Sequence, residues 1–119
     1  VFDEFPMASQ VALLKHALAH RAELEAISEE TLRAYLAGDL AAIWRIHVAS
    51  TARYPQLAEH HASFTKRVVL DRSVVMAFRM QRQLRKGRAF VAVGVLHLYG
   101  PKGVLALLEQ DGYRVTRVF

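Results

Sequence analysis

The sequence predicts an α+β fold, in which four or five helices over residues 1–87 precede a β-α-β unit over residues 88–119. Apolar residues recur at helical spacing in the first part, whereas Ala89–Val93 alternate in the manner of a strand. A helix is then expected from Pro101 to about Gln110, and a terminal strand over Tyr113–Phe119.

Two strands alone make a poor sheet, because their unpaired edges and one uncovered face favour further pairing. The β-α-β unit is therefore expected to belong to a larger sheet or to be completed by oligomerisation. No internal repeat or low-complexity linker divides the chain, so residues 1–119 are treated as a single region.

The first two helices are expected on either side of Ser28. Apolar residues at helical spacing predict one long amphipathic helix over Met7–Ala26. Ser28 is a residue type that caps helices, so it predicts the start of the second helix, and Gly38 predicts its end.

Asp39 predicts the N-cap of a third helix that includes Ile46. The Tyr54-Pro55 pair interrupts the helical pattern, because the residue before a proline avoids the helical region. A further helix is expected from Gln56, and it continues over Lys66–Lys86 until Gly87 ends it. One face of this continuation is expected to be buried: Leu70, Val74, Ala77 and Leu84.

The high content of hydrophobic residues suggests that part of the surface of this chain is buried against another chain or domain. Hydrophobic residues make up 53% of the 119 residues and the mean hydropathy is +0.13, which is high for a small soluble domain. The chain also begins at Val1 rather than at a methionine. We therefore expect either an oligomer or the C-terminal part of a longer protein.

The sequence has no cysteine, which excludes disulfides and thiolate metal sites within it. Because no apolar run approaches the roughly 20 residues that cross a bilayer, no membrane span is expected in this chain. These features do not assign a cellular compartment.

The net charge of +5 is unevenly distributed. Between Phe64 and Arg88 the only acidic residue is Asp71, and four basic residues of this stretch share one polar sector of the predicted helix: Arg72, Arg79, Arg82 and Lys86. A solvent-exposed face is the preferred interpretation, and a surface for phosphates or an acidic partner is the alternative. Nucleic-acid binding is not expected, because this stretch lacks the aromatic or glycine-rich segments with which proteins usually contact bases.

His97 is the histidine whose position most favours function. It follows the expected first strand and precedes a Gly-Pro helix start, and ligands of α/β folds bind at the carboxyl ends of strands. The alternative is a partly buried histidine that is hydrogen-bonded to backbone. Gly94 either lets the chain turn or lets a ligand approach closely.

The remaining histidines give weaker signals. His16 and His20 are four residues apart with Glu23 on the same flank, a spacing seen in helical zinc sites, but no glutamate lies between the two histidines to act as base. We therefore favour solvated side chains over a metal site. Three others are treated as structural or surface residues: His47, His60 and His61.

Together these residues resemble the TraB/GumN family, relatives of the Tiki metalloproteases, over nearly the whole chain. The resemblance is carried by Phe5–Gln10, by Ala34–Leu40 ahead of a tryptophan, by Asp71-Arg72, and most specifically by Phe90–Val115. Family members have an early and a late Gly-x-x-His motif, an early glutamate and a late Arg-Asn pair. Only the late part of this pattern is present here.

The resemblance implies site residues. Gly94 and His97 match the late Gly-x-x-His motif, so His97 would be a metal ligand or polar catalytic group, and Arg72 matches the arginine of the pair. Ser73 stands in place of the asparagine, and Asp71 stands where a glutamate often precedes it. A zinc or manganese ion is the implied cofactor.

The implied function is a metal-dependent, protease-like hydrolase acting on a peptide substrate. Its site would be completed by an N-terminal half of the same protein that is not in this chain, because a catalytic zinc needs about three protein ligands. This chain alone is therefore expected to be inactive. The alternative is a non-catalytic helical module that uses its apolar surplus for oligomerisation and its basic face for an anionic partner.

Overall fold

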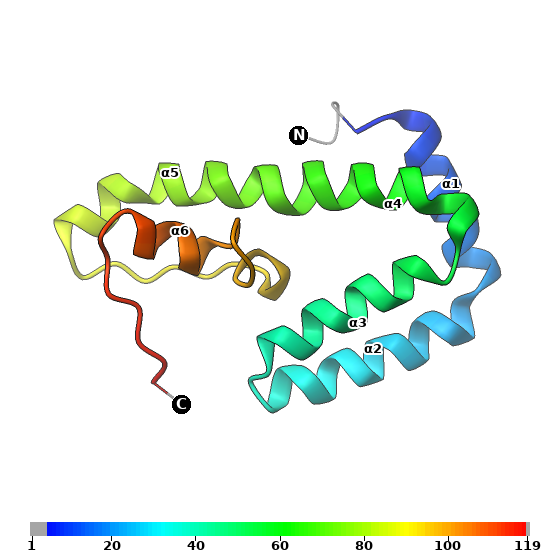
Figure 1. Cartoon of the computed structure of the whole chain (residues 1–119), viewed down its shortest axis with the longest axis horizontal. Helices are drawn as coiled ribbons and strands as arrows, with labels where there is room; N and C mark the ends of the chain where they lie inside the picture. Colours follow the sequence, from blue (N-terminus) through cyan, green and yellow to red (C-terminus); the bar gives the residue numbers. More distant parts are fainter. Residues whose placement is uncertain (1–4, 119) are drawn as a thin grey trace. The chain divides into compact units, whose positions relative to one another are not determined.

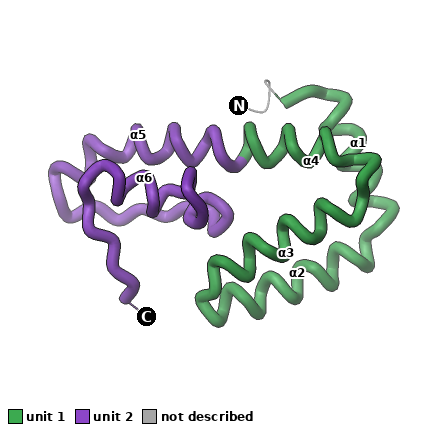
Figure 2. Tube along the Cα trace, in the orientation of Figure 1, with its two compact units in different colours: residues 1–68 green, residues 69–119 purple. Residues whose placement is uncertain are grey.

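The computed structural model describes residues 5–118, and within this range the chain forms helices joined by irregular segments, without a strand (Figure 1). The chain divides into two compact units, residues 1–68 and residues 69–119 (Figure 2). Each unit is described by itself below.

The predicted α+β class is wrong, because the part of the chain that is described is all-helical. Ala89–Val93 and residues 113–118 have neither helical nor strand hydrogen bonding, while Phe119 lies outside the described residues. A strand exists only when its backbone groups pair with those of a neighbour. Both segments have the residue types of strands, but neither pairs with the other or with a third segment.

The described part of the first unit, residues 5–68, contains four α-helices and a short 3₁₀ turn. These elements are α1 (Met7–Ala19), α2 (Arg21–Leu36), α3 (Leu40–Ala52), η2 (Pro55–Leu57) and α4 (Ala58–Phe64). The single helix predicted over Met7–Ala26 is broken at His20, whose φ of −120° and ψ of 36° lie outside the helical region. Ser28 consequently lies inside α2 and caps nothing.

The connection between α2 and α3 is as predicted. Gly38 has φ +66°, the left-handed conformation that ends helices. The Asp39 carboxylate then accepts a hydrogen bond of 2.8 Å from the Ala42 amide and caps α3. This tight turn makes α2 and α3 pack against each other as a hairpin, as Figure 1 shows.

The small core of the first unit joins α1 to α4. Phe5 is buried and makes an edge contact with Phe64, with ring centroids 6.0 Å apart. The buried Ser9 hydroxyl lies 2.9 Å from Nδ1 of His60, and Ile43 is buried on α3. The predicted break at Tyr54-Pro55 is confirmed, since the proline opens η2 just ahead of α4.

The second unit is built on one long helix. A π-helical segment, η3 (Thr65–Leu70), leads into α5 (Asp71–Lys86), which Gly87 ends with φ +75° as predicted. An irregular stretch then contains the 3₁₀ turn η4 (Val95–His97) and leads to α6 (Val104–Gln110). The last helix starts later than predicted, because the Gly103 amide donates to the Gly100 carbonyl and closes a turn.

One stripe along α5 and the segment before it holds the second unit together. Val69, Ser73 and Ala77 are buried and lie four residues apart, so they share one face. Gln81 continues the stripe and bonds to residues beyond α6. The predicted buried face is therefore only partly right: Ala77 belongs to it, whereas Val74 is 45% exposed.

Gly103 is a position where only glycine fits. A Cβ atom there would lie 2.5 Å from the backbone oxygens of both Leu98 and Tyr99. Backbone atoms cannot move aside as a flexible side chain can. The return of the chain from η4 into α6 therefore requires the missing side chain.

Gly103→Ala should destabilise the second unit, by about 1–3 kcal/mol for an overpacked site. The matched control is Gly94→Ala, because Gly94 has φ −62° and an added Cβ would meet only His97 Cδ2 at 3.6 Å. Chemical denaturation followed by circular dichroism measures both variants. Equal stability of the two proteins would contradict the close approach described at Gly103.

Candidate functional site

The η4 turn joins the two residues of the late Gly-x-x-His motif. The His97 amide donates to the Gly94 carbonyl at 2.9 Å, so that these two residues lie at the two ends of one 3₁₀ turn. His97 is half-buried. Its backbone is thereby fixed, and its ring is directed by contacts with α5.

The Nδ1 atom of His97 lies against the buried stripe. It is 3.0 Å from the Ser73 hydroxyl oxygen and 3.1 Å from the Val69 carbonyl oxygen. The Ser73 hydroxyl donates its proton to that same carbonyl at 2.7 Å. Since the serine proton is used and a carbonyl can only accept, Nδ1 must carry the hydrogen of the neutral ring. Nε2 is then the unprotonated nitrogen, available as a base or ligand.

A groove of about 570 Å³ lies beside this ring. It brings together all three residues that the family resemblance implied, namely Arg72 from α5 and Gly94 and His97 from η4 and its cap. Its other lining residues are Met76, Arg79, Met80, Val91, Ala92 and Val93. The groove is therefore largely apolar, with two guanidinium groups and one imidazole.

Gly94 is not required by the backbone. Its φ of −62° and ψ of 141° are open to any residue, and an added Cβ would make only an ordinary contact with His97. What the glycine provides is a bare backbone on the wall of the groove. This fits close approach of a ligand better than a need to turn the chain.

The groove does not hold a complete set of metal ligands. Among the described residues that line it, His97 is the only side chain of a type that binds catalytic zinc or manganese, and Arg72 and Arg79 would repel a cation beside it. Within residues 5–118 no group of three His, Asp or Glu side chains is arranged to hold a metal ion. These residues by themselves therefore do not fit a catalytic zinc or manganese, which takes about three protein ligands.

Ser73 is the site residue that sequence reasoning missed. It occupies the position of the family asparagine, and it is almost fully buried, at 1% exposure, with its hydroxyl against His97. The sequence holds two signals, the resemblance that places Ser73 at the position of the asparagine and its spacing of four from Val69 and Ala77, but neither by itself predicts a contact with His97. Asp71, its neighbour at the expected glutamate position, is exposed.

His16, His20 and Glu23 meet around Tyr54 in the first unit. The Tyr54 ring lies 4.1 Å from that of His16 and 5.0 Å from that of His20, measured between centroids. The two imidazoles are themselves 4.2 Å apart. Both rings therefore pack against an aromatic side chain, unlike the solvated histidines that the sequence favoured.

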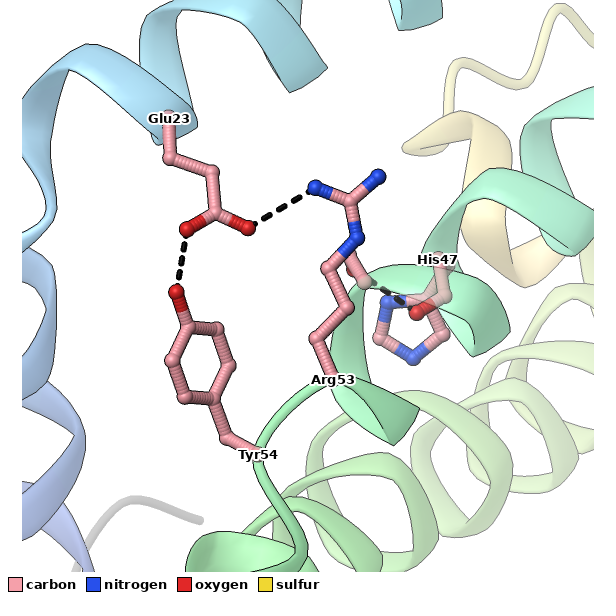
Figure 3. Close-up of polar contacts among 5 residues, drawn as sticks. Glu23, His47, Arg53 and Tyr54 are labelled. Atoms are coloured by element: carbon pink, nitrogen blue, oxygen red, sulfur yellow. Dashed lines mark hydrogen bonds and ion pairs between the residues drawn. The ribbon is translucent and has the colours of Figure 1, made fainter.

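Both oxygens of Glu23 are already engaged (Figure 3). One accepts from Arg53 at 2.8 Å and the other from the Tyr54 hydroxyl. The Tyr54 hydrogen bond, followed by the one from Arg53, lowers the pKa of Glu23, and the same contact raises the pKa of Tyr54. This carboxylate stabilises the junction of α2 with the end of α3, and both of its oxygens are used by Arg53 and Tyr54.

The other three histidines also lie within the first unit. His47 Nε2 is 3.1 Å from the Thr65 hydroxyl, and His60 contacts Ser9. Nε2 of His61 is shielded from solvent and has no hydrogen-bond partner among the described residues. Burial lowers the pKa of His61, and the positive charges of the nearby His16 and His60 lower it further. Burial also lowers the pKa of His47, with a smaller contribution from the charge of His61.

The basic sector predicted on α5 is mainly solvent-facing. Arg79, Arg82 and Lys86 are exposed, while Arg72 is half-buried at the His97 groove. Arg72 thus leaves the solvated sector and joins the candidate site. No helix within the described range is both long enough and apolar enough to span a membrane.

We expect NMR to find the neutral His97 ring protonated at Nδ1. Long-range ¹H–¹⁵N correlation at about pH 8 separates the two tautomers of a neutral imidazole. Ser73→Ala should weaken the preference for this tautomer, because only the Val69 carbonyl oxygen then remains as an acceptor for Nδ1. A wild-type ring protonated at Nε2 would contradict the contact described here.

The first unit should lose stability as the pH falls below about 6.5, the usual histidine pKa. The folded-state pKa values of His47 and His61 lie below their ordinary value, so the unfolded chain binds protons first and acid favours it. Thermal unfolding from about pH 7.5 to 5 measures the effect. His61→Gln should flatten the profile, and an unchanged slope in that variant would rule out His61 as its source.

Comparison with known protein families identifies a match over nearly the whole chain. The model of the TraB/PrgY/gumN family matches residues 1–117. No curated protein matches the chain, and no solved structure matches it.

Proposed function

Because the chain belongs to the TraB/PrgY/gumN family, we propose that residues 69–119 supply one wall of a hydrolase site that acts on a peptide. The observation that carries the proposal is the His97 ring, whose Nδ1 is held by Ser73 and Val69 and whose Nε2 is left available in a groove with Arg72. A base with an oriented ring beside a cation is a common arrangement for attack on a carbonyl.

In this proposal His97 acts through Nε2. The nitrogen accepts the proton of a water molecule as the water oxygen attacks a carbonyl carbon of the substrate. Arg72 stabilises the negative charge that develops on the carbonyl oxygen. The carbonyl then re-forms as the C–N bond breaks, and His97 Nε2 returns its proton to the leaving amine nitrogen. Ser73 is a positioning residue, since it fixes the tautomer and orientation of the imidazole and does not line the groove.

The groove also fits a peptide in its other properties. Its apolar wall, formed by Met76, Met80 and Val91 among others, suits side chains of a substrate. The bare backbone at Gly94 lets a substrate chain approach the wall closely. A divalent metal bound at this groove would need further ligands from residues outside it.

The test is peptide cleavage by the gene product that contains this chain. His97→Gln should lower the cleavage rate of a quenched fluorescent peptide by about 10²–10⁴-fold, the usual contribution of a general base. Lys102→Gln is the matched control, because Lys102 is exposed in the same unit and does not line the groove. Cleavage that survives His97→Gln, or no cleavage by the wild type of any peptide in a random library, would overturn the proposal.

Gly94→Ala adds a second readout to the same assay. The added methyl group fits the folded chain, but it takes up space in the groove. It should therefore raise KM for the peptide while circular dichroism and unfolding stay at wild-type values. Unchanged KM would contradict the role given to the bare backbone.

A further inference from the structure

A second groove, of about 910 Å³, lies on the last turns of α5. One wall comes from α5 and the other from the turn that follows α6. Its lining residues are Phe78, Arg79, Gln81, Arg82, Arg85, Asp111, Gly112 and Tyr113. Apart from Arg79, none of these residues lines the His97 groove.

The positive charge of the protein is concentrated in the unit that carries this groove. Residues 69–119 contain nine Lys or Arg against three Asp or Glu, a formal net charge of +6. Residues 1–68 contain seven against eight, a net charge of −1. The excess charge of the chain thus comes entirely from the second unit.

The guanidinium groups in the groove are not neutralised. Among the described residues, Arg79, Arg82 and Arg85 take part in no ion pair. The only carboxylate in the lining, Asp111, accepts a hydrogen bond of 2.6 Å from Gln81 Nε2. That bond comes from a neutral amide, so Asp111 keeps its charge, and the three arginines and one aspartate give the lining a formal net charge of +2. A negatively charged ligand on the arginines would relieve their mutual repulsion.

The groove also has a hydrophobic element. Phe78 is 79% exposed, which is unusual for so large an apolar side chain on a charged helix. Tyr113 is held in place because its hydroxyl donates to Gln81 Oε1 at 3.1 Å. Arginine, phenylalanine and tyrosine together are the residue types enriched where proteins bind proteins.

We propose that this groove binds an acidic peptide segment of a partner protein, with carboxylates on Arg82 and Arg85 and an apolar side chain against Phe78. Arginine pairs with carboxylates through two parallel hydrogen bonds, which gives such a peptide a defined register. The surface is short for nucleic acid, since Arg79 to Arg85 spans only about 9 Å of helix. A phosphate backbone usually needs a longer row of cations.

The test is fluorescence polarisation with a labelled peptide that is rich in Glu and contains one Phe. The groove variant is Arg82→Glu/Arg85→Glu, and the matched control is Lys102→Glu/Arg114→Glu, which changes the net charge equally outside the groove. The groove variant should weaken binding by at least about tenfold, whereas the control should stay within about threefold. Phe78→Ser should also weaken binding, without a change in net charge.

Several outcomes would overturn the proposal. Equal losses in the groove variant and in the control would mean that net charge alone attracts the peptide. Tighter binding of a single-stranded oligonucleotide than of the peptide, lost in the groove variant, would make the surface a nucleic-acid site. Sedimentation that shows a wild-type dimer and a monomeric groove variant would identify a second copy of the chain as the occupant. If the wild-type protein does not bind the peptide, the proposal is also wrong.

Discussion

The contact between the Ser73 hydroxyl and the His97 ring is the interaction on which the second unit depends. The stretch between α5 and α6 has little regular backbone pairing, apart from the turn of η4 and the turn that Gly103 closes on Gly100. His97 anchors this stretch to α5 by reaching back to a serine and a carbonyl that are 24 and 28 residues earlier in the chain. A buried hydroxyl with its partners satisfied can hold such a segment, whereas an unpaired one would cost free energy.

Helix α5 contributes to two different surfaces, which share Arg79. Ser73 and Ala77 face the segments packed on the helix, and Gln81 ties down the turn after α6. Arg72 and Met76 line the groove of His97, while Phe78, Arg82 and Arg85 line the second groove. One helix thus contributes to the groove of His97 and also to the second groove, which is rich in arginine.

Local signals were enough to predict much of the helical part. The cap at Asp39, the end of α5 at Gly87 and the break at Tyr54-Pro55 depend on one or two residues, and the structure has all three. The predicted strands failed because a β-forming segment becomes a strand only where a partner backbone is available, which its own residues do not reveal. The resemblance placed Ser73 at the position of the asparagine, but its contact with His97 was missed for a related reason: a polar residue on a helix is expected to be exposed until its distant partner is known.

The most direct test of this account is a double-mutant cycle between Ser73→Ala and His97→Gln, measured by chemical denaturation. The account predicts that the two substitutions are not additive, with a coupling free energy between about 0.5 and 3 kcal/mol, as for residues in direct contact. Losses of stability that simply add would mean that Ser73 and His97 act independently. In that case the serine would not hold the histidine, and the orientation of Nε2 toward the groove would lose its physical basis.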